Sequence, residues 1–317
     1  MNNPNTVDLA VIIVNYKTPK LVIDCLDSLY PELSNIKSRV IVVDNASGDN
    51  SLSQIEKWLK SKRNEERHLT HLVQSEKNGG FSAGNNLGIR QVKAKKYLLL
   101  NSDTIVRSKA IEKLLRRMDE NPEIGALGPR LEYLDETPQI SAFRKRTVTS
   151  EFIRGAELSV VTRFLKHKKV SIDLDQVNQV IDWVSFACVL IRHEVIEKVG
   201  LMDDRFFMYF EDIEYCNRIK GAGYKIEQEP LARVVHLRGG TSTVKSSLAK
   251  RKRLPRYFYE SRARYFTLLG GRSTLMAANF AWMFGRIFRL IKLTRGLRGL
   301  QSVKSEWKDI WIGINSQ

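Results

Sequence analysis

The sequence predicts an α/β fold built around a mostly parallel β-sheet. Short apolar runs rich in β-branched residues alternate with helical segments, and a polar turn follows each run. Strands and helices that alternate at this spacing form βαβ units with right-handed crossovers. The loops after parallel strands then converge on one rim of the sheet, which is where open α/β sheets bind their ligands.

The elements follow in order along the chain. A strand over residues 7–14 precedes Pro19, which suits the first turn of a helix that we expect to reach about Leu29. A second buried strand covers residues 40–43 and ends in the polar stretch 44–51. Strand, turn and helix then repeat with strands over 68–74 and 96–100 and helices over about 82–92 and 108–118. Further strands are predicted at 125–129, 181–190 and 233–235, the second of them crossing beneath the site.

A carboxylate follows the strand over residues 96–100 directly, in the triplet Asn101-Ser102-Asp103. Proteins bind Mg²⁺ and similar ions through one or two side chains and leave the other positions to substrate phosphates. Asp103 therefore suits a Mn²⁺ or Mg²⁺ site for a nucleotide diphosphate. Since Asp is common in turns, the alternative is that Asp103 only starts the turn into the next helix.

Residues 78–81, Asn-Gly-Gly-Phe, allow a close backbone approach to a ligand just ahead of a predicted helix N-terminus. This arrangement suits a diphosphate or a ribose. No G-x-G-x-x-G motif follows the first strand, which argues against a nicotinamide-dependent oxidoreductase.

An aromatic run followed by adjacent acids over residues 203–214 places Glu211 and Asp212 at the mouth of a partly dry pocket. A general base needs such a carboxylate. Aromatic neighbours would raise its pKa and the start of a helix would lower it, so the net shift stays open. The alternative is that both acids only cap the helix.

Six stretches in this order resemble glycosyltransferase family 2 enzymes with the GT-A fold, most of all bacterial rhamnosyltransferase-like members. They cover roughly the first 240 residues, at 12–16, 42–47, 78–86, 101–103, 207–212 and 236–242. The resemblance implies a nucleotide-binding, mostly parallel sheet with helices on both faces. It also implies a glycosyltransferase domain over residues 1–240, with a nucleotide-sugar half at 1–105 and an acceptor half at 106–240.

By this resemblance the chain would be an inverting, metal-dependent glycosyltransferase. We expect no covalent intermediate, because no second carboxylate is evidently placed under the donor sugar. Asp212 is the implied base, with Glu211 orienting the acceptor or acting in its place. Asp44 would accept the imide N–H of uracil or thymine, although a simple turn role remains the alternative. The implied nucleotide-sugar contacts are Val14, Asn15, Tyr16, Asp44, Asn78, Gly80, Phe81, Asn85, Asn101, Ser102 and Asp103.

The metal motif departs from the family's usual Asp-x-Asp form, since Asn101 stands at its first position. We therefore expect Asp103 to be the direct ligand and Asn101 to contact sugar or water. His236 matches a family position that reaches the metal, and imidazole suits Mn²⁺ better than Mg²⁺. The alternative is that His236 is an ordinary polar residue whose hydrogen bonds are made within the protein.

Acceptor contacts are expected from Trp183, by stacking on a sugar, from Glu211, and from Arg144 in the basic stretch 141–146. Arg144 and Arg146 could face phosphate. The alternatives are core packing for Trp183 and a solvated basic face for the two arginines.

Positive charge is concentrated in the C-terminal region. From Arg238 onward there are 17 Lys and Arg against 3 Asp and Glu, a net of +14, which leaves +3 of the total +17 for the rest. The apolar segment 273–285 is shorter than the about 20 residues of a spanning helix. Residues 241–317 are therefore predicted to be a basic amphipathic helical region that lies on an anionic membrane surface. The alternatives are packing on the core or a homo-oligomer interface, and nucleic acid is not favoured because no nucleic-acid module is recognisable.

Three cysteines, Cys25, Cys188 and Cys216, lie in apolar patterns and are predicted to be buried thiols in a reducing compartment. Residues 1–8 lack the basic start and apolar core of a signal peptide. The expected location is peripheral, on the cytoplasmic face of the inner membrane.

The resemblance favours transfer of L-rhamnose from dTDP-L-rhamnose to a lipid-linked cell-surface glycan. UDP-galactofuranose, UDP-galactose and UDP-glucosamine-type donors are the alternatives. A catalytically silent sugar-nucleotide-binding scaffold at the membrane is the alternative of another class. Asn101 favours it, while Asp103, the Glu211-Asp212 pair and His236 oppose it.

Overall fold

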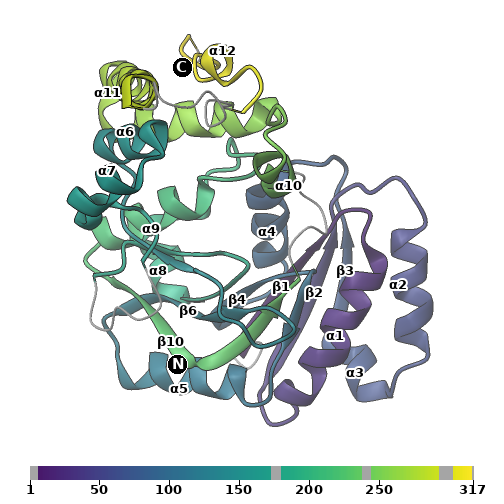
Figure 1. Cartoon of the computed structure of the whole chain (residues 1–317). Helices are drawn as coiled ribbons and strands as arrows, with labels where there is room; N and C mark the ends of the chain where they lie inside the picture. Colours follow the sequence, from purple (N-terminus) through teal and green to yellow (C-terminus); the bar gives the residue numbers. More distant parts are fainter. Residues whose placement is uncertain (1–5, 173–179, 238–243, 293–302, 316–317) are drawn as a thin grey trace.

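A computed structural model of the chain describes residues 6–172, 180–237, 244–292 and 303–315 (Figure 1). Its main sheet has eight strands in the order β3-β2-β1-β4-β9-β6-β10-β5. β9 runs antiparallel to β4 and β6, β5 runs antiparallel to β10, and the other neighbours pair in parallel. The predicted mostly parallel sheet is therefore confirmed.

The strands of this sheet are β1 (Val7–Asn15), β2 (Ser38–Asp44), β3 (Thr70–Gln74), β4 (Ala94–Asn101), β5 (Thr104–Val106), β6 (Ile124–Glu132), β9 (Cys188–Arg192) and β10 (Lys225–His236). A separate two-stranded ribbon joins β7 (Ala142–Phe143) to β8 (Trp183–Val184). The helices are α1 (Pro19–Leu33), α2 (Ser51–Lys60), α3 (Asn64–Leu69), α4 (Gly80–Arg90), α5 (Ala110–Glu120), α6 (Val148–Ala156), α7 (Ser159–Phe164), α8 (His193–Val199), α9 (Glu211–Gly221), α10 (Val244–Ala249), α11 (Arg256–Lys292) and α12 (Glu306–Asp309).

Helices cover both faces of the sheet because its central strands are apolar on both sides. Along β1, Leu9 and Val11 belong to the core shared with α1, α2 and α5. Ala10 and Ile12 belong to the opposite core, shared with α4, α8 and α9. Successive side chains of a strand point to opposite faces, so a continuous apolar run requires a helical layer on each.

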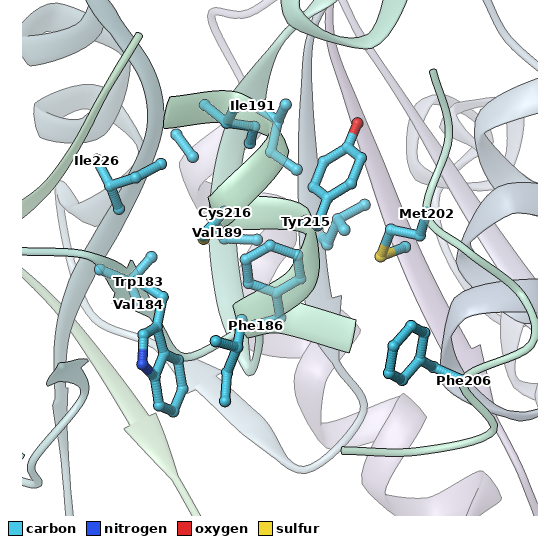
Figure 2. Close-up of a cluster of buried hydrophobic side chains, with 14 of the residues drawn as sticks. Trp183, Val184, Phe186, Val189, Ile191, Met202, Phe206, Tyr215, Cys216 and Ile226 are labelled. Atoms are coloured by element: carbon cyan, nitrogen blue, oxygen red, sulfur yellow. The ribbon is translucent and has the colours of Figure 1, made fainter. Parts of the chain in front are cut away.

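The second core holds α9 in place. Figure 2 shows Tyr215 and Cys216 of α9 close to Phe186 and Val189, with Phe206 nearby. The rings of Phe186 and Tyr215 meet edge to face, with centroids 6.2 Å apart. This packing determines where the N-terminus of α9, and therefore Glu211 and Asp212, lies at the rim.

Several elements differ from those predicted. The expected single strand over 181–190 is two strands, because β8 pairs with β7 while β9 inserts between β4 and β6. The strand predicted at 233–235 is the end of the longer β10, and α3 and β5 were not anticipated. α1 continues past Leu29 to Leu33, whose burial against the core extends the helix through Pro31.

The C-terminal region packs against the preceding part of the chain. α11 kinks at Gly270 and Gly271, and Gly271 has φ +75°. Before the kink, Phe258 and Tyr265 contact the ring of Phe210. After it, α11 crosses α6 so closely that a Cβ on Gly285 would lie 2.4 Å from the carbonyl oxygen of Phe152. None of the helices in the described ranges is long and apolar enough to cross a membrane.

A buried ion cluster joins α6 to α11. Glu151 is fully buried and pairs with Arg146, Arg154 and Arg262, and the Arg262 Nη2 to Glu151 Oε2 distance is 2.9 Å. Burial opposes ionisation of Glu151, yet the charges of the three arginines outweigh it and hold its pKa well below the usual range. Part of the C-terminal positive charge is therefore neutralised inside the protein.

The three cysteines are free and buried, as predicted. Burial raises the pKa of the Cys25 thiol to about 12, which makes it a small apolar side chain at physiological pH.

Candidate active site

A chain of polar contacts runs along the carboxyl ends of β2, β1 and β4. Asn15 Nδ2 donates to Asp44 Oδ1 at 2.7 Å. Thr18 Oγ1 donates to Asn15 Oδ1 at 3.2 Å and lies 3.4 Å from Ser102 Oγ. Residues that are predicted to contact the nucleotide sugar, from the ends of three strands, thus lie at one rim of the sheet.

Asp44 is buried within this rim. Its Oδ1 accepts hydrogen bonds from Asn15 and Ser47, and its Oδ2 accepts from the backbone N–H of Ser47 at 3.1 Å. A carboxylate oxygen has two lone pairs, so Oδ2 retains capacity for one further donor. Recognition of an imide N–H by Asp44 remains a prediction that this geometry permits.

The glycine loop is held by two asparagines. Asn78 Oδ1 accepts from the Gly80 N–H and from Asn45 Nδ2, both at 3.0 Å, and Asn45 Nδ2 also reaches the Gly80 carbonyl at 3.0 Å. The Oδ1 atom of Asn45 is buried without a hydrogen-bond partner in the part of the chain that the structure describes. Asn45 was missed as a site residue, although its place beside Asp44 in the second stretch is the signal that could have found it.

The glycine loop touches the stretch that carries the acids. The Phe81 N–H donates to the Phe207 carbonyl at 2.7 Å, and Asn85 Nδ2 donates to the Phe81 carbonyl at 2.9 Å. Gly80 has φ +84°, and a Cβ there would lie 2.0 Å from the Phe207 carbonyl oxygen. Only glycine fits, so this contact links the donor loop directly to residues 203–212.

Asp103 and His236 lie together, as predicted for a metal pair. The register of β10 with β5 sets His236 opposite Thr104, and His236 Nε2 is 3.5 Å from Asp103 Oδ1. Gln139 Nε2 donates to the His236 carbonyl at 2.8 Å, which anchors the end of β10. His236 Nδ1 is buried and has no hydrogen-bond partner among the described residues.

This pair fits a divalent ion of the Mn²⁺ type. A carboxylate and an imidazole side by side are suitable ligands, and neighbouring ligands of a six-coordinate ion lie about 3 Å apart. Within the described ranges, no group of three or more His, Cys, Asp or Glu gathers around one point. Substrate phosphates and water would therefore supply the other ligands.

The two acids at the start of α9 have different environments. Tyr209 and Phe210 both have positive φ, near +70°, and this strained turn presents Glu211 and Asp212. Glu211 is 7% exposed, and its Oε2 has no hydrogen-bond partner among the described residues. Burial, and then the charge of Asp212, raise the pKa of Glu211 well above its usual range. Asp212 is half-buried, so its carboxylate is the more accessible of the two.

We expect Glu211→Gln to stabilise the protein increasingly as the pH rises. The folded state holds the Glu211 proton more tightly than the unfolded chain, so wild-type stability falls with pH above about 4.3, by up to about 1.4 kcal/mol per pH unit from this group. Glutamine keeps the neutral shape and removes this dependence. Urea unfolding of both proteins between about pH 5 and about pH 8 measures this dependence; parallel curves would show that Glu211 is not held neutral.

The predicted acceptor residues lie around the β7–β8 ribbon. Trp183 is 8% exposed and stacks on Phe143 with ring centroids 3.9 Å apart, and its Nε1 donates to the Arg144 carbonyl at 3.0 Å. Arg144 itself donates to the carbonyls of Lys169 and Ser171. Both contacts favour a packing role, and acceptor binding by these two residues stays a prediction.

Arg146 is better placed than Arg144 to act at the site. Its guanidinium lies over the Phe210 ring, 5.1 Å from the centroid, and interacts electrostatically with Asp212. Arg146 Nη1 also donates to Glu151 at 3.2 Å, so the buried ion cluster reaches the acid pair. The basic stretch 141–146 was the sequence signal, but its run of positive charges did not distinguish the two arginines.

With this geometry in place, comparison with known proteins identifies the class. Residues 10–200, more than half of the chain, match Glycosyl transferase family 2. The chain belongs to this family, and it is a glycosyltransferase. The matched span ends before Asp212 and His236, whose roles therefore rest on the geometry described above.

Curated relatives are similar at low identity. A low-salt glycan biosynthesis hexosyltransferase of Haloferax volcanii is 26% identical over 72% of this chain and 67% of its own length. The dTDP-rhamnosyl transferase RfbF of Shigella flexneri is 27% identical over 74% of this chain and 71% of its own length. An N-acetylglucosaminyl-diphospho-decaprenol L-rhamnosyltransferase of Mycobacterium tuberculosis is 28% identical over 44% of this chain, and the match spans 46% of that relative.

Among solved structures, a mannosyltransferase of Pyrobaculum calidifontis in complex with GDP-Man and Mn²⁺ has a TM-score of 0.58 to this chain. The two are 16% identical, and the similarity covers 92% of this chain and 77% of the other. At that identity the likeness concerns the fold alone, and it confirms the predicted GT-A architecture.

Proposed function

We propose that this glycosyltransferase moves L-rhamnose from dTDP-L-rhamnose to a lipid-linked glycan acceptor, with inversion at the anomeric carbon. The observation that carries the mechanism is the contact of the Gly80–Phe81 loop with Phe207, because it joins the donor rim to the acid pair. The choice of sugar is supported by the names of the Shigella and mycobacterial relatives. The mycobacterial name, which specifies a diphospho-decaprenol, supports the lipid-linked acceptor.

In this mechanism Asp212 accepts the proton of the acceptor hydroxyl as that oxygen attacks the anomeric carbon. The new C–O bond forms opposite the bond to the diphosphate, whose electron pair leaves with the nucleoside diphosphate. Glu211, whose pKa is raised by burial and then by the charge of Asp212, would position the acceptor. A divalent ion held by Asp103 and His236 would stabilise the negative charge on the departing diphosphate.

An enzyme with a lipid-linked acceptor works at a membrane surface. We place it peripherally on the cytoplasmic face, where nucleotide sugars are available. UDP-galactofuranose and other UDP-hexoses remain the alternative donors, because an imide N–H is common to uracil and thymine.

Donor choice is tested by the binding of a panel of nucleotide sugars to the full chain with Mn²⁺, measured by calorimetry. We expect dTDP-L-rhamnose to bind most tightly and GDP-mannose, which lacks the pyrimidine imide, to bind weakly. Tighter binding of a UDP-hexose would show that the proposed donor sugar is wrong. A preference for the guanine nucleotide would contradict the role assigned to Asp44.

A further inference from the structure

The second half of α11, after the kink at Gly271, buries polar side chains beside apolar ones and exposes a row of apolar side chains. Asn279, Arg286 and Arg289 point inward and are 0%, 5% and 8% exposed. Phe280 and Phe284 point outward and are 54% and 61% exposed. A surface helix of a soluble protein normally turns its apolar side to the core and its charged side to water.

The outward side forms one stripe. Its members recur at intervals of four, four and three residues, which places them on a single helix face: Met276, Phe280, Phe284 and Ile287. The segment around α12 extends this stripe: Trp307 of α12 is 37% exposed, and the ring of Trp311, just after α12, meets Phe280 edge to face at 5.6 Å. Contiguous exposed apolar side chains of this kind mark an interaction surface.

Near the stripe, acidic side chains are buried and lysine side chains are exposed. The acids of α12, Glu306 and Asp309, are buried and bind Arg154 and Arg253, with both Arg253 to Asp309 contacts at 2.8 Å. Lys308 of α12 and Lys304, which precedes its N-cap, are exposed. The outer surface therefore combines apolar and aromatic side chains with unbalanced positive charge.

We propose that this docking stripe, made of Met276, Phe280, Phe284, Ile287, Trp307 and Trp311 with Lys304 and Lys308, binds the surface of an anionic membrane. Aromatic and aliphatic side chains enter the headgroup region while the flanking cations bind lipid phosphates. A second copy of the chain would bring the same cations face to face, so charge complementarity favours lipid. Figure 1 shows α11 and α12 together at the end of the molecule away from α5. Membrane binding by this stripe does not depend on which sugar the enzyme transfers.

The test compares matched pairs of substitutions in the full chain by cosedimentation with phosphatidylglycerol-containing vesicles and with pure phosphatidylcholine vesicles. Phe280→Ser with Phe284→Ser should weaken binding to the anionic vesicles by about 10-fold or more. Lys304→Glu with Lys308→Glu should weaken it and flatten its dependence on salt. Leu134→Ser with Leu231→Ser, which alters side chains 64% and 62% exposed elsewhere, should leave it unchanged.

Donor binding and melting temperature near the wild-type values would show that the variants fold. Equal vesicle binding by wild type and the Phe280/Phe284 variant would overturn the proposal. A dimer in sedimentation that the phenylalanine substitutions dissociate, without vesicle binding, would overturn it as well and assign the stripe to a second copy.

Discussion

Replacing Asp212 with asparagine should lower the rate of sugar transfer by roughly 10²-fold or more while leaving donor affinity nearly unchanged. Asparagine keeps the shape of the side chain and its place at the start of α9 but cannot accept a proton. Asp212 is the more accessible acid of the pair, and burial favours the neutral form of Glu211. Single-turnover transfer with saturating donor, together with calorimetric donor binding, measures both parts of this prediction.

Glu211→Gln is the matched control, because it makes the same chemical change at the neighbouring buried acid. We expect a smaller loss of transfer for this variant, since glutamine preserves the uncharged form. If Asp212→Asn retained transfer near the wild-type rate and Glu211→Gln abolished it, the base would be Glu211 and the assignment to Asp212 would be wrong.

Replacing Asp103 with alanine should produce the second large effect, a loss of metal-dependent donor binding of about 10-fold or more. Asp103 is the charged member of the pair with His236, and a neutral imidazole is more easily replaced by water or phosphate than a carboxylate is. His236→Ala should therefore weaken binding less. Titration of the donor into each variant with Mn²⁺ measures these affinities.

The same titrations with a chelator in place of Mn²⁺ provide the control. Wild type should lose affinity on chelation, whereas Asp103→Ala should change little, because its metal site is already impaired. Full activity of the wild-type enzyme in the presence of chelator would refute the metal assignment. Basic side chains would then have to stabilise the leaving group.

Much of the fold could be predicted because its strands are short continuous apolar runs with polar turns after them. The runs that became β1, β2 and β4 signal burial on both faces, which only a sheet between two helical layers provides. The break between β8 and β9 could not be seen, because the alternation over 181–190 continues through the residues where the chain changes sheets. Strand pairing, rather than local pattern, decides such a break.

The rim of the candidate site could also be predicted, since residues that follow parallel strands must meet at one edge. Asn15 contacts Asp44 directly, and Thr18 connects Asn15 to Ser102. The surroundings of the acids could not, because they depend on distant segments. Arg146 lies over the ring of Phe210, and its partner Glu151 pairs with Arg262 of α11, 111 residues further along the chain. Lone arginines in a basic C-terminal region carry no sequence signal that separates buried ion pairs from solvated charge.

In the proposed mechanism, a sugar donor held at the ends of β1, β2 and β4 is attacked directly by an acceptor hydroxyl that Asp212 deprotonates. The most direct measurement is the transfer of sugar by the wild-type enzyme from dTDP-L-rhamnose to a polyprenyl-diphosphate-linked sugar in Mn²⁺, with the anomeric configuration of the product determined by NMR. We expect a new glycoside of inverted configuration. Donor binding without transfer to any acceptor would indicate a catalytically silent sugar-nucleotide binder, and a product of retained configuration would contradict direct displacement.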